Sequence, residues 1–168
     1  MTAGAATSRP DRRHRYHLTV SWTGNLGSGT RSYAGYSRDH EVSGEGKPAI
    51  AGSSDPSFRG DPGRWSPEEL TLAALSQCHM LWYLHLCSRA GIVVTGYVDM
   101  PEATLVEHPD GSGEFVEATL RPRVTLGDPS RAAEAAALHG EAHDLCFVAR
   151  SVNFPVSCVP LAETAASA

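Results

Sequence analysis

Apolar residues dominate one long stretch of the chain, residues 66–91, and point around most of the circumference of the helix that this stretch predicts. Ser66 can cap the helix, Pro67 suits its first turn, and Glu69 completes a capping box. Gly91 is a typical residue for its end. A helix that is apolar on nearly every side must be buried, and a chain of 168 residues has little else to cover it. The pattern therefore favours a partner subunit.

Alternation of apolar and polar residues predicts strands on both sides of this helix. Residues 15–22 alternate throughout, which is typical of a half-buried strand, and residues 31–36 are expected to return as its hairpin partner. Residues 39–65 are rich in Gly, Pro, Ser and charge, and predict a long loop. After the helix, the β-branched residues in 92–98 predict another strand.

The last third of the chain predicts a hairpin, a second helix and an edge strand. Residues 103–107 and 114–126 are expected to pair, and the second segment alternates core positions with Glu, Thr and Arg. A helix is expected over residues 128–150, opened by an Asp-Pro pair. Residues 151–160 predict a final edge strand, because Pro155 cannot donate a hydrogen bond to a sheet.

Composition points to a single α+β domain that acts on a small molecule. The length suits one domain, expected over residues 15–161, with flexible tails at residues 1–14 and 162–168. A net charge of -5 with 14 scattered Lys and Arg residues disfavours nucleic acid or an anionic membrane as a partner. Residues 1–13 lack the apolar core of a signal peptide, and no apolar run spans a membrane. We expect a soluble cytoplasmic protein.

Four cysteines, Cys78, Cys87, Cys146 and Cys158, form no C-x-x-C motif and are expected to be reduced in the cytoplasm. A cysteine such as Cys78 is most often a small buried apolar residue. The order of elements changes this expectation, because Cys78 in one helix and Cys146 near the end of another can meet where the two helices pack. Cys87 lies on the opposite side of the helix from Cys78, and we expect Cys87 and Cys158 to serve in packing.

The segment SPEELTLAALSQCHM, followed 65 to 70 residues later by a cysteine in AHDLC, resembles the OsmC/Ohr family of thiol peroxidases. This family comprises the osmotically induced protein C and organic hydroperoxide resistance proteins. The resemblance covers roughly residues 16–159. It implies an OsmC-like fold in which antiparallel curved sheets wrap around two long central helices of an intertwined homodimer. It also implies that Cys78 is the peroxidatic cysteine, Cys146 the resolving cysteine, and Glu68 the glutamate at the helix start.

An arginine completes the site that the resemblance implies. Arg59 in FRGDPGRW resembles the loop arginine of the OsmC branch, while Arg31 and Arg64 remain alternatives for the residue that faces the thiol. Two departures from the family pattern stand beside the cysteines. Phe147 replaces the proline that commonly follows the resolving cysteine, and His79 after the first cysteine suggests a separate branch with its own preferred substrate.

The implied chemistry is the reduction of organic hydroperoxides to alcohols through a cysteine sulfenic acid and an intrasubunit disulfide. An arginine favours the thiolate and can bind the peroxide, and a glutamate can orient that arginine. An external dithiol of the lipoyl or thioredoxin type would clear the disulfide, and we expect no cofactor. An apolar channel would select alkyl hydroperoxides. Its lining is expected to be Leu81, Trp82 and Phe147.

Helix geometry adds an argument of its own for a dimer. Along a straight helix, Glu68 and Cys78 are about 15 Å apart and rotated by about 280°, so one arginine cannot reach both. No proline or glycine interrupts the segment between them. We therefore expect Glu68 to serve the Cys78 of another subunit, with active sites at the interface.

Two other functions remain open at this point. His139, His143 and Cys146 share a helix face, and with Cys78 or His79 they could bind zinc or copper. Alternatively, the dimer is noncatalytic and encloses a hydrophobic ligand. The lining would then be Trp82, Tyr83 and Phe147.

Overall fold

The computed structural model describes residues 11–161 and 164–165. The chain divides into two compact units, with the boundary between Ser66 and Pro67. The sequence predicts flexible tails at residues 1–14 and 162–168. Most of these residues, namely 1–10, 162–163 and 166–168, lie outside the described residues.

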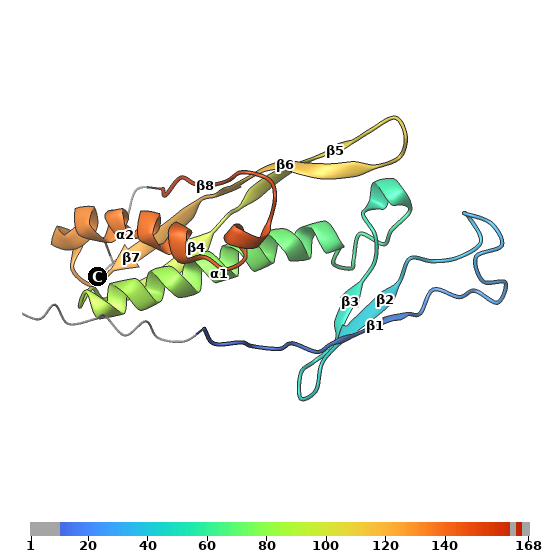
Figure 1. Ribbon diagram of the computed structural model, residues 1–168, viewed down its shortest axis with the longest axis horizontal. Coiled ribbons are helices and arrows are strands. Elements are labelled where there is room, and N and C mark those ends of the chain that lie inside the picture. The colour runs from blue at the N-terminus through green and yellow to red at the C-terminus, as the bar shows by residue number, and fades with distance from the viewer. Residues whose placement is uncertain (1–10, 162–163, 166–168) are drawn as a thin grey trace, which may run out of the picture. The chain divides into compact units, whose positions relative to one another are not determined.

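The N-terminal unit is built on a three-stranded antiparallel sheet (Figure 1). Its strands are β1 (Thr19–Trp22), β2 (His40–Ser43) and β3 (Ile50–Gly52), in that spatial order, followed by a short 3-10 helix, η1 (Pro56–Phe58). The expected strand at residues 31–36 is therefore wrong, and the expected loop at 39–65 contains two strands. Strand β1 is also shorter than expected, and all four of its residues are exposed within this chain.

The connection between β1 and β2 explains why the tight hairpin does not form. Thr23 N–H donates to Asp39 O at 2.9 Å, and Ser37 N–H donates to Gly24 O at 2.9 Å, so residues 24–38 close as a wide loop. A Cβ at Gly24 would overlap Ser37 O, so the close approach of the two segments requires glycine. The strand therefore pairs with residues beyond the loop, in the register Trp22 to His40.

The C-terminal unit contains two helices and two three-stranded sheets (Figure 1). The helices, which pack against each other, are α1 (Pro67–Arg89) and α2 (Ala132–Leu145). One sheet has the order β4 (Val94–Asp99), β7 (Pro122–Leu126), β9 (Thr164–Ala165). The other has the order β5 (Glu102–Glu107), β6 (Gly113–Leu120), β8 (Val156–Cys158). Two further 3-10 helices are η2 (Pro129–Arg131) and η3 (Ala149–Ser151).

The long central helix is confirmed, and its end has a defined geometry. Gly91 has φ 69°, the Ile92 N–H donates to Cys87 O at 2.9 Å, and the Gly91 N–H donates to Ser88 O at 3.1 Å. These bonds form a Schellman motif, which satisfies the last carbonyls of the helix. Among the described helices, none combines the length and apolarity that crossing a membrane requires.

The expected hairpin strand at 114–126 is two strands that belong to different sheets. β6 pairs with β5 and β8, whereas β7 pairs with β4. The break falls at Arg121, whose N–H donates to the Asp99 side chain at 2.7 Å, and β7 begins at Pro122, which has no N–H. The edge strand expected at residues 151–160 is shorter, since only β8 forms there, and it pairs in parallel with β6.

The α1–α2 contact forms the main hydrophobic core. Tyr83, Leu86 and Cys87 of α1 pack with residues of α2 and β7, including Ala135 and Val124. The helix expected over residues 128–150 is shorter, since α2 ends at Leu145. Cys146 follows with φ −67° and ψ 108°, an extended backbone. The α+β class and the OsmC-like fold of mixed helices and antiparallel sheets agree with these elements.

Candidate functional site

Two cysteines from different elements meet where α1 and α2 pack. Cys78 lies in the middle of α1 and is half-buried, whereas Cys146 lies directly after α2 and is buried. Their side chains are hydrogen-bonded to each other, and both thiols are free. The structure therefore brings together the two cysteines that the sequence singles out.

The surroundings of Cys146 favour its neutral thiol. Burial, followed by the hydrogen bond with Cys78, raises the pKa of Cys146 to about 11. The Ala149 N–H donates a hydrogen bond to the sulfur, with an N to Sγ distance of 3.5 Å, and this bond acts in the opposite direction by lowering the pKa. At neutral pH, Cys146 is therefore a thiol that can donate its hydrogen to the Cys78 sulfur.

Aromatic side chains stand beside both thiols. Trp82, one turn after Cys78, contacts Phe147, the residue after Cys146, edge to face with a centroid separation of 5.5 Å. Phe147 is 68% exposed and Leu81 is 63% exposed. Apolar side chains are thus available to a ligand that approaches the thiols.

Glu68 lies in the first turn of α1. The helix continues without interruption to Cys78, which confirms that about 15 Å of helix separates the two residues along the axis. The Glu68 Oε2 atom is buried and has no hydrogen-bond partner among the described residues. A buried carboxylate oxygen of this kind is costly unless a donor reaches it.

All three candidate arginines belong to the N-terminal unit. Arg59 ends η1 with a left-handed backbone, φ 67° and ψ 29°, which is uncommon for a residue other than glycine. The Arg64 Nε atom lies 3.7 Å from an Asp39 carboxylate oxygen and 3.7 Å from one of Asp61. Arg31 is exposed. The residue that faces the Cys78 thiol stays a prediction.

The metal site expected as an alternative is not assembled as the sequence suggests. Cys78 and Cys146 pair with each other, and the metal-ligand group found among the described residues is His79, His139 and Cys158. Cys158, which is expected from the sequence to serve in packing, is thus the third member of the group, and no spacing along the chain relates it to either histidine.

The two imidazoles of this group are buried and neutral. Burial is the main cause that lowers the pKa of His79 and of His139 to about 4 each. The ring of Tyr83 stacks on His139 with a centroid separation of 3.9 Å. The Tyr83 contact fixes the plane of the His139 imidazole.

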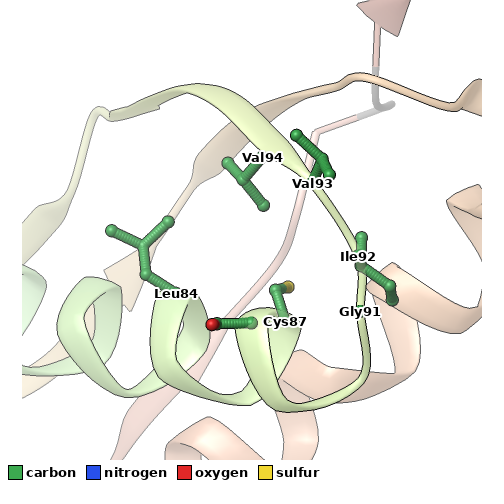
Figure 2. Close-up of a pocket in the computed structure, with 7 residues that line it drawn as sticks. Leu84, Cys87, Gly91, Ile92, Val93 and Val94 are labelled. Carbon is green, nitrogen blue, oxygen red and sulfur yellow. The ribbon is translucent and has the colours of Figure 1, made fainter.

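Cys87 belongs to a different part of the unit. It lines a pocket of about 350 Å³ at the C-terminal end of α1. Figure 2 shows it there beside Leu84, Ile92 and Val94. Along the helix, Cys87 is about 13 Å from Cys78. This thiol is therefore separate from the Cys78 and Cys146 pair.

The sequence profile of a family described as OsmC-like protein matches residues 60–159. The chain belongs to this OsmC-like family. The matched region contains Glu68, Cys78 and Cys146, and it begins directly after Arg59. A search of curated proteins gave no match.

Solved structures carry the same fold as this OsmC-like chain. An OsmC-like protein of unknown function from Vibrio cholerae is 28% identical with a TM-score of 0.78, covering 89% of this chain and 100% of the other. An organic hydroperoxide resistance protein from Legionella pneumophila is 18% identical with a TM-score of 0.62, covering 87% and 98%. An organic hydroperoxide resistance protein of Bacillus subtilis is 18% identical with a TM-score of 0.59, covering 87% and 98%.

Proposed function

We propose that this OsmC-like protein is a thiol-dependent peroxidase that reduces organic hydroperoxides to alcohols. The observation that carries the proposal is that the Cys78 and Cys146 side chains meet, together with their unequal burial. A peroxidatic thiol must be reachable by substrate, and a resolving thiol must be close to it but need not face solvent. Cys78 meets the first condition and Cys146 meets the second.

The reaction starts with Cys78 as a thiolate. Its sulfur attacks the terminal oxygen of the hydroperoxide, the O–O bond breaks, and the alkoxide takes up a proton and leaves as an alcohol. Cys78 is then a sulfenic acid. The Cys146 sulfur attacks the Cys78 sulfur, a disulfide forms, and water leaves. An external dithiol, of the lipoyl or thioredoxin type, is oxidised as it returns both cysteines to thiols.

The apolar side chains beside the thiols support an organic substrate. Leu81 and Phe147 are both exposed, and Phe147 also contacts Trp82. Contact with an alkyl or aryl group would remove their apolar surface from water, whereas hydrogen peroxide offers no such surface. The organic hydroperoxide resistance proteins from Legionella pneumophila and Bacillus subtilis share the fold, which agrees with this choice of substrate.

We also propose that two chains form an intertwined homodimer in which Glu68 serves the Cys78 of the partner. The buried Oε2 atom of Glu68 supports this role, because an arginine of the active site would provide the missing donor. Arg59 is the first candidate for that arginine, with Arg31 and Arg64 as alternatives. Its guanidinium would stabilise the thiolate and bind the peroxide oxygens.

The proposal is tested by treating the reduced protein with cumene hydroperoxide and measuring intact mass and free thiols. The wild type is expected to lose two thiols and to form a disulfide between Cys78 and Cys146. Cys146→Ser is expected to accumulate a sulfenic acid at Cys78, which dimedone would trap. Cys78→Ser is expected to be inert, and Cys87→Ser provides the matched control because its thiol lies elsewhere on α1.

An unmodified Cys78 after exposure to an organic hydroperoxide would show that the chain is not a thiol peroxidase. The substrate class is checked separately, by comparing kcat/KM for cumene hydroperoxide and hydrogen peroxide. Equal values would contradict a preference for organic substrates and leave the dithiol chemistry intact.

A further inference from the structure

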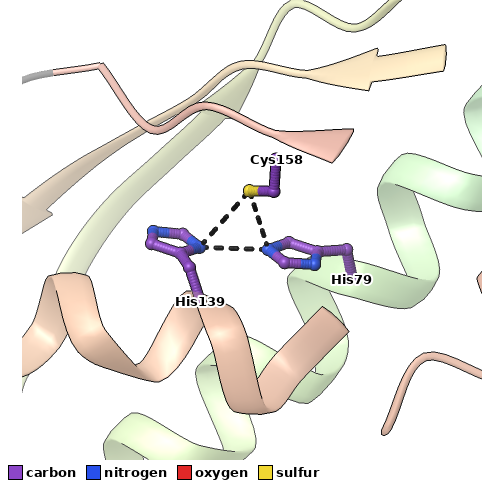
Figure 3. A group of neighbouring side chains, drawn as sticks. All are labelled: His79, His139 and Cys158. Carbon is purple, nitrogen blue, oxygen red and sulfur yellow. Dashed lines mark hydrogen bonds between the residues drawn. The ribbon is translucent and has the colours of Figure 1, made fainter. Parts of the chain in front are cut away.

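A second cluster of chemically active side chains lies within the C-terminal unit. His79 comes from α1, His139 from α2 and Cys158 from β8, and Figure 3 shows the three side chains pointing toward one another. The ligand atoms are His79 Nε2, His139 Nδ1 and Cys158 Sγ, all within 4.8 Å of one another. Two of the residues are buried and the third is half-buried. Three separate elements thus bring nitrogen and sulfur ligands to one point.

The spacing of these atoms matches a tetrahedral metal. The two nitrogens are 3.0 Å apart, and the sulfur is 3.5 Å from His79 Nε2 and 4.0 Å from His139 Nδ1. Zinc with its usual bond lengths separates two tetrahedral nitrogens by about 3.4 Å, and a nitrogen from a sulfur by about 3.6 Å. Each observed separation is therefore within a few tenths of an ångström of the zinc geometry.

We propose that His79, His139 and Cys158 bind one zinc ion, with the fourth coordination position left open. Neutral imidazoles and a thiolate are the ligands that zinc prefers. Binding exchanges the Cys158 thiol proton for the metal, so one proton is released and one sulfur to zinc bond forms.

Packing alone gives a poor account of this histidine pair. The outward nitrogens, His79 Nδ1 and His139 Nε2, are buried and have no hydrogen-bond partner among the described residues. Burying a polar atom without a partner costs roughly 1 to 3 kcal/mol. An apolar side chain of similar size would avoid this cost, so the two imidazoles need another reason to be in the core, and metal ligation provides one.

A fixed carboxylate lies near the cluster and complements its charge. Asp99 accepts a hydrogen bond from Ser76 Oγ at 2.6 Å and from Arg121 N–H at 2.7 Å. Its charge acts on both His79 and Cys158. A zinc ion with one thiolate and two imidazoles has a net charge of about +1, which the Asp99 carboxylate would offset. Asp99 is thus placed as an outer group that stabilises the occupied site.

Solvent can reach the cluster through a pocket. The pocket has a volume of about 350 Å³ and is lined by His139 and Cys158, together with His143 and Asp144. Three protein ligands leave one position of a tetrahedral ion for water or an incoming ligand. The pocket provides an entry path for the metal and space for that fourth ligand.

The zinc site shares no ligand with the proposed peroxidase pair. Cys78 and Cys146 contact each other as free thiols and not this cluster, although His79 directly follows Cys78 in α1. Zinc binding is therefore expected even in a variant whose peroxide chemistry has been removed.

The test is a titration of zinc chloride into reduced, chelator-treated full-length protein, with a colorimetric chelator as competitor. One ion per chain is expected for the wild type. Cys158→Ser and His139→Gln are each expected to weaken binding by tenfold or more. Cys87→Ser and Cys146→Ser are the matched controls and are expected to bind zinc as the wild type does. Far-ultraviolet circular dichroism establishes that each variant is folded.

X-ray absorption at the zinc edge of the loaded wild type gives a second, variant-free measurement. One sulfur and two imidazole nitrogens in the first shell are expected. Absence of stoichiometric zinc, unchanged affinity in Cys158→Ser, or loss of zinc in Cys146→Ser would each overturn the proposal, and the last result would place the metal on the peroxidase thiols instead.

Discussion

At the scale of single residues, the two thiols of the proposed active site differ in burial and in the contacts that their sulfur atoms make. Cys146 is buried, contacts the Ala149 N–H and has its pKa raised to about 11. Cys78 is half-buried in the middle of a helix. Their contact lets the Cys146 thiol donate a hydrogen to the Cys78 sulfur.

The raised pKa of Cys146 predicts a specific loss of stability in alkali. The unfolded thiol ionises near its ordinary value of 9.0, whereas the folded thiol ionises near 11. The unfolded chain therefore loses its proton first, and the free energy of unfolding falls as pH rises through this window. In full the contribution is about 3 kcal/mol, of which about 2 kcal/mol is lost by pH 11.

Urea unfolding of the reduced wild type and of Cys146→Ala, at pH 8 and at pH 11, checks this prediction. The wild type is expected to lose about 2 kcal/mol more than the variant between the two pH values. Cys146→Ser, which also lacks a thiol, is expected to follow the alanine variant. Identical pH dependence in all three proteins would contradict the effect of burial on Cys146.

Phe147 is expected to contribute to substrate binding rather than to stability. It is 68% exposed and contacts Trp82, so Phe147→Ala should change the free energy of unfolding by less than about 1 kcal/mol. The lost apolar contact should lower kcat/KM for cumene hydroperoxide by roughly tenfold and leave the value for hydrogen peroxide nearly unchanged. Val93→Ala, at a residue that is 63% exposed, is the control. An equal loss for both peroxides would rule out this selective role.

At the scale of elements, the sequence predicts best where the signals are local. Pro67 and Gly91 mark the two ends of α1 because a helix start and a helix stop depend on neighbouring residues alone. Strands β2 and β3 are three or four residues long, and their pairing depends on a wide loop that closes at Gly24. Such a distant contact has no signature in a short segment.

The pair of Cys78 and Cys146 can be predicted from the sequence, whereas the cluster of His79, His139 and Cys158 cannot, because only the first depends on local signals. Cys78 and Cys146 are both associated with helices that the pattern predicts, so their meeting could be expected. Cys158 joins His79 and His139 only because β8 pairs in parallel with β6 and passes the histidine pair. No spacing along the chain encodes that arrangement.

Glycine substitutions at two helix positions are expected to have opposite effects on stability. Gly91 has φ 69°, so Gly91→Ala should destabilise the fold by about 1 kcal/mol. A Cβ there comes no closer than 3.9 Å to another group, so the cost is conformational rather than steric. Gly140 lies inside α2 with open space around it, and Gly140→Ala should stabilise by about 1 kcal/mol. Thermal unfolding of both variants provides the comparison, and shifts of the same sign would refute it.

At the scale of the whole molecule, several features agree with an assembly of two chains. The apolar side chains of β1 remain exposed, with Val20 at 61% and Trp22 at 44%. The Glu68 Oε2 atom is buried without a hydrogen-bond partner in the described part of the chain. A symmetric partner chain could cover the exposed apolar side chains of β1 and bring a hydrogen-bond donor to Glu68 Oε2. These observations support the proposed homodimer.

Mixed dimers offer a direct test of the role proposed for Glu68. Glu68→Gln and Cys78→Ser are each expected to be nearly inactive alone. If Glu68 serves the Cys78 of the partner, a mixed dimer contains one site with both native residues. Unfolding and refolding the two variants together should then restore about a quarter of wild-type activity. If both residues acted within one chain, no mixed dimer would have an intact site and activity would stay at the level of the separate variants.

Cys146 stands one residue beyond the end of α2, with an extended backbone. Cys78 presents its sulfur from within α1, whereas Cys146 follows the last turn of α2 and can move with the segment after it. In the proposed cycle, the disulfide would therefore close and reopen with the backbone hydrogen bonds of both helices in place. The movement that each turnover requires would be confined to the short connection between α2 and β8.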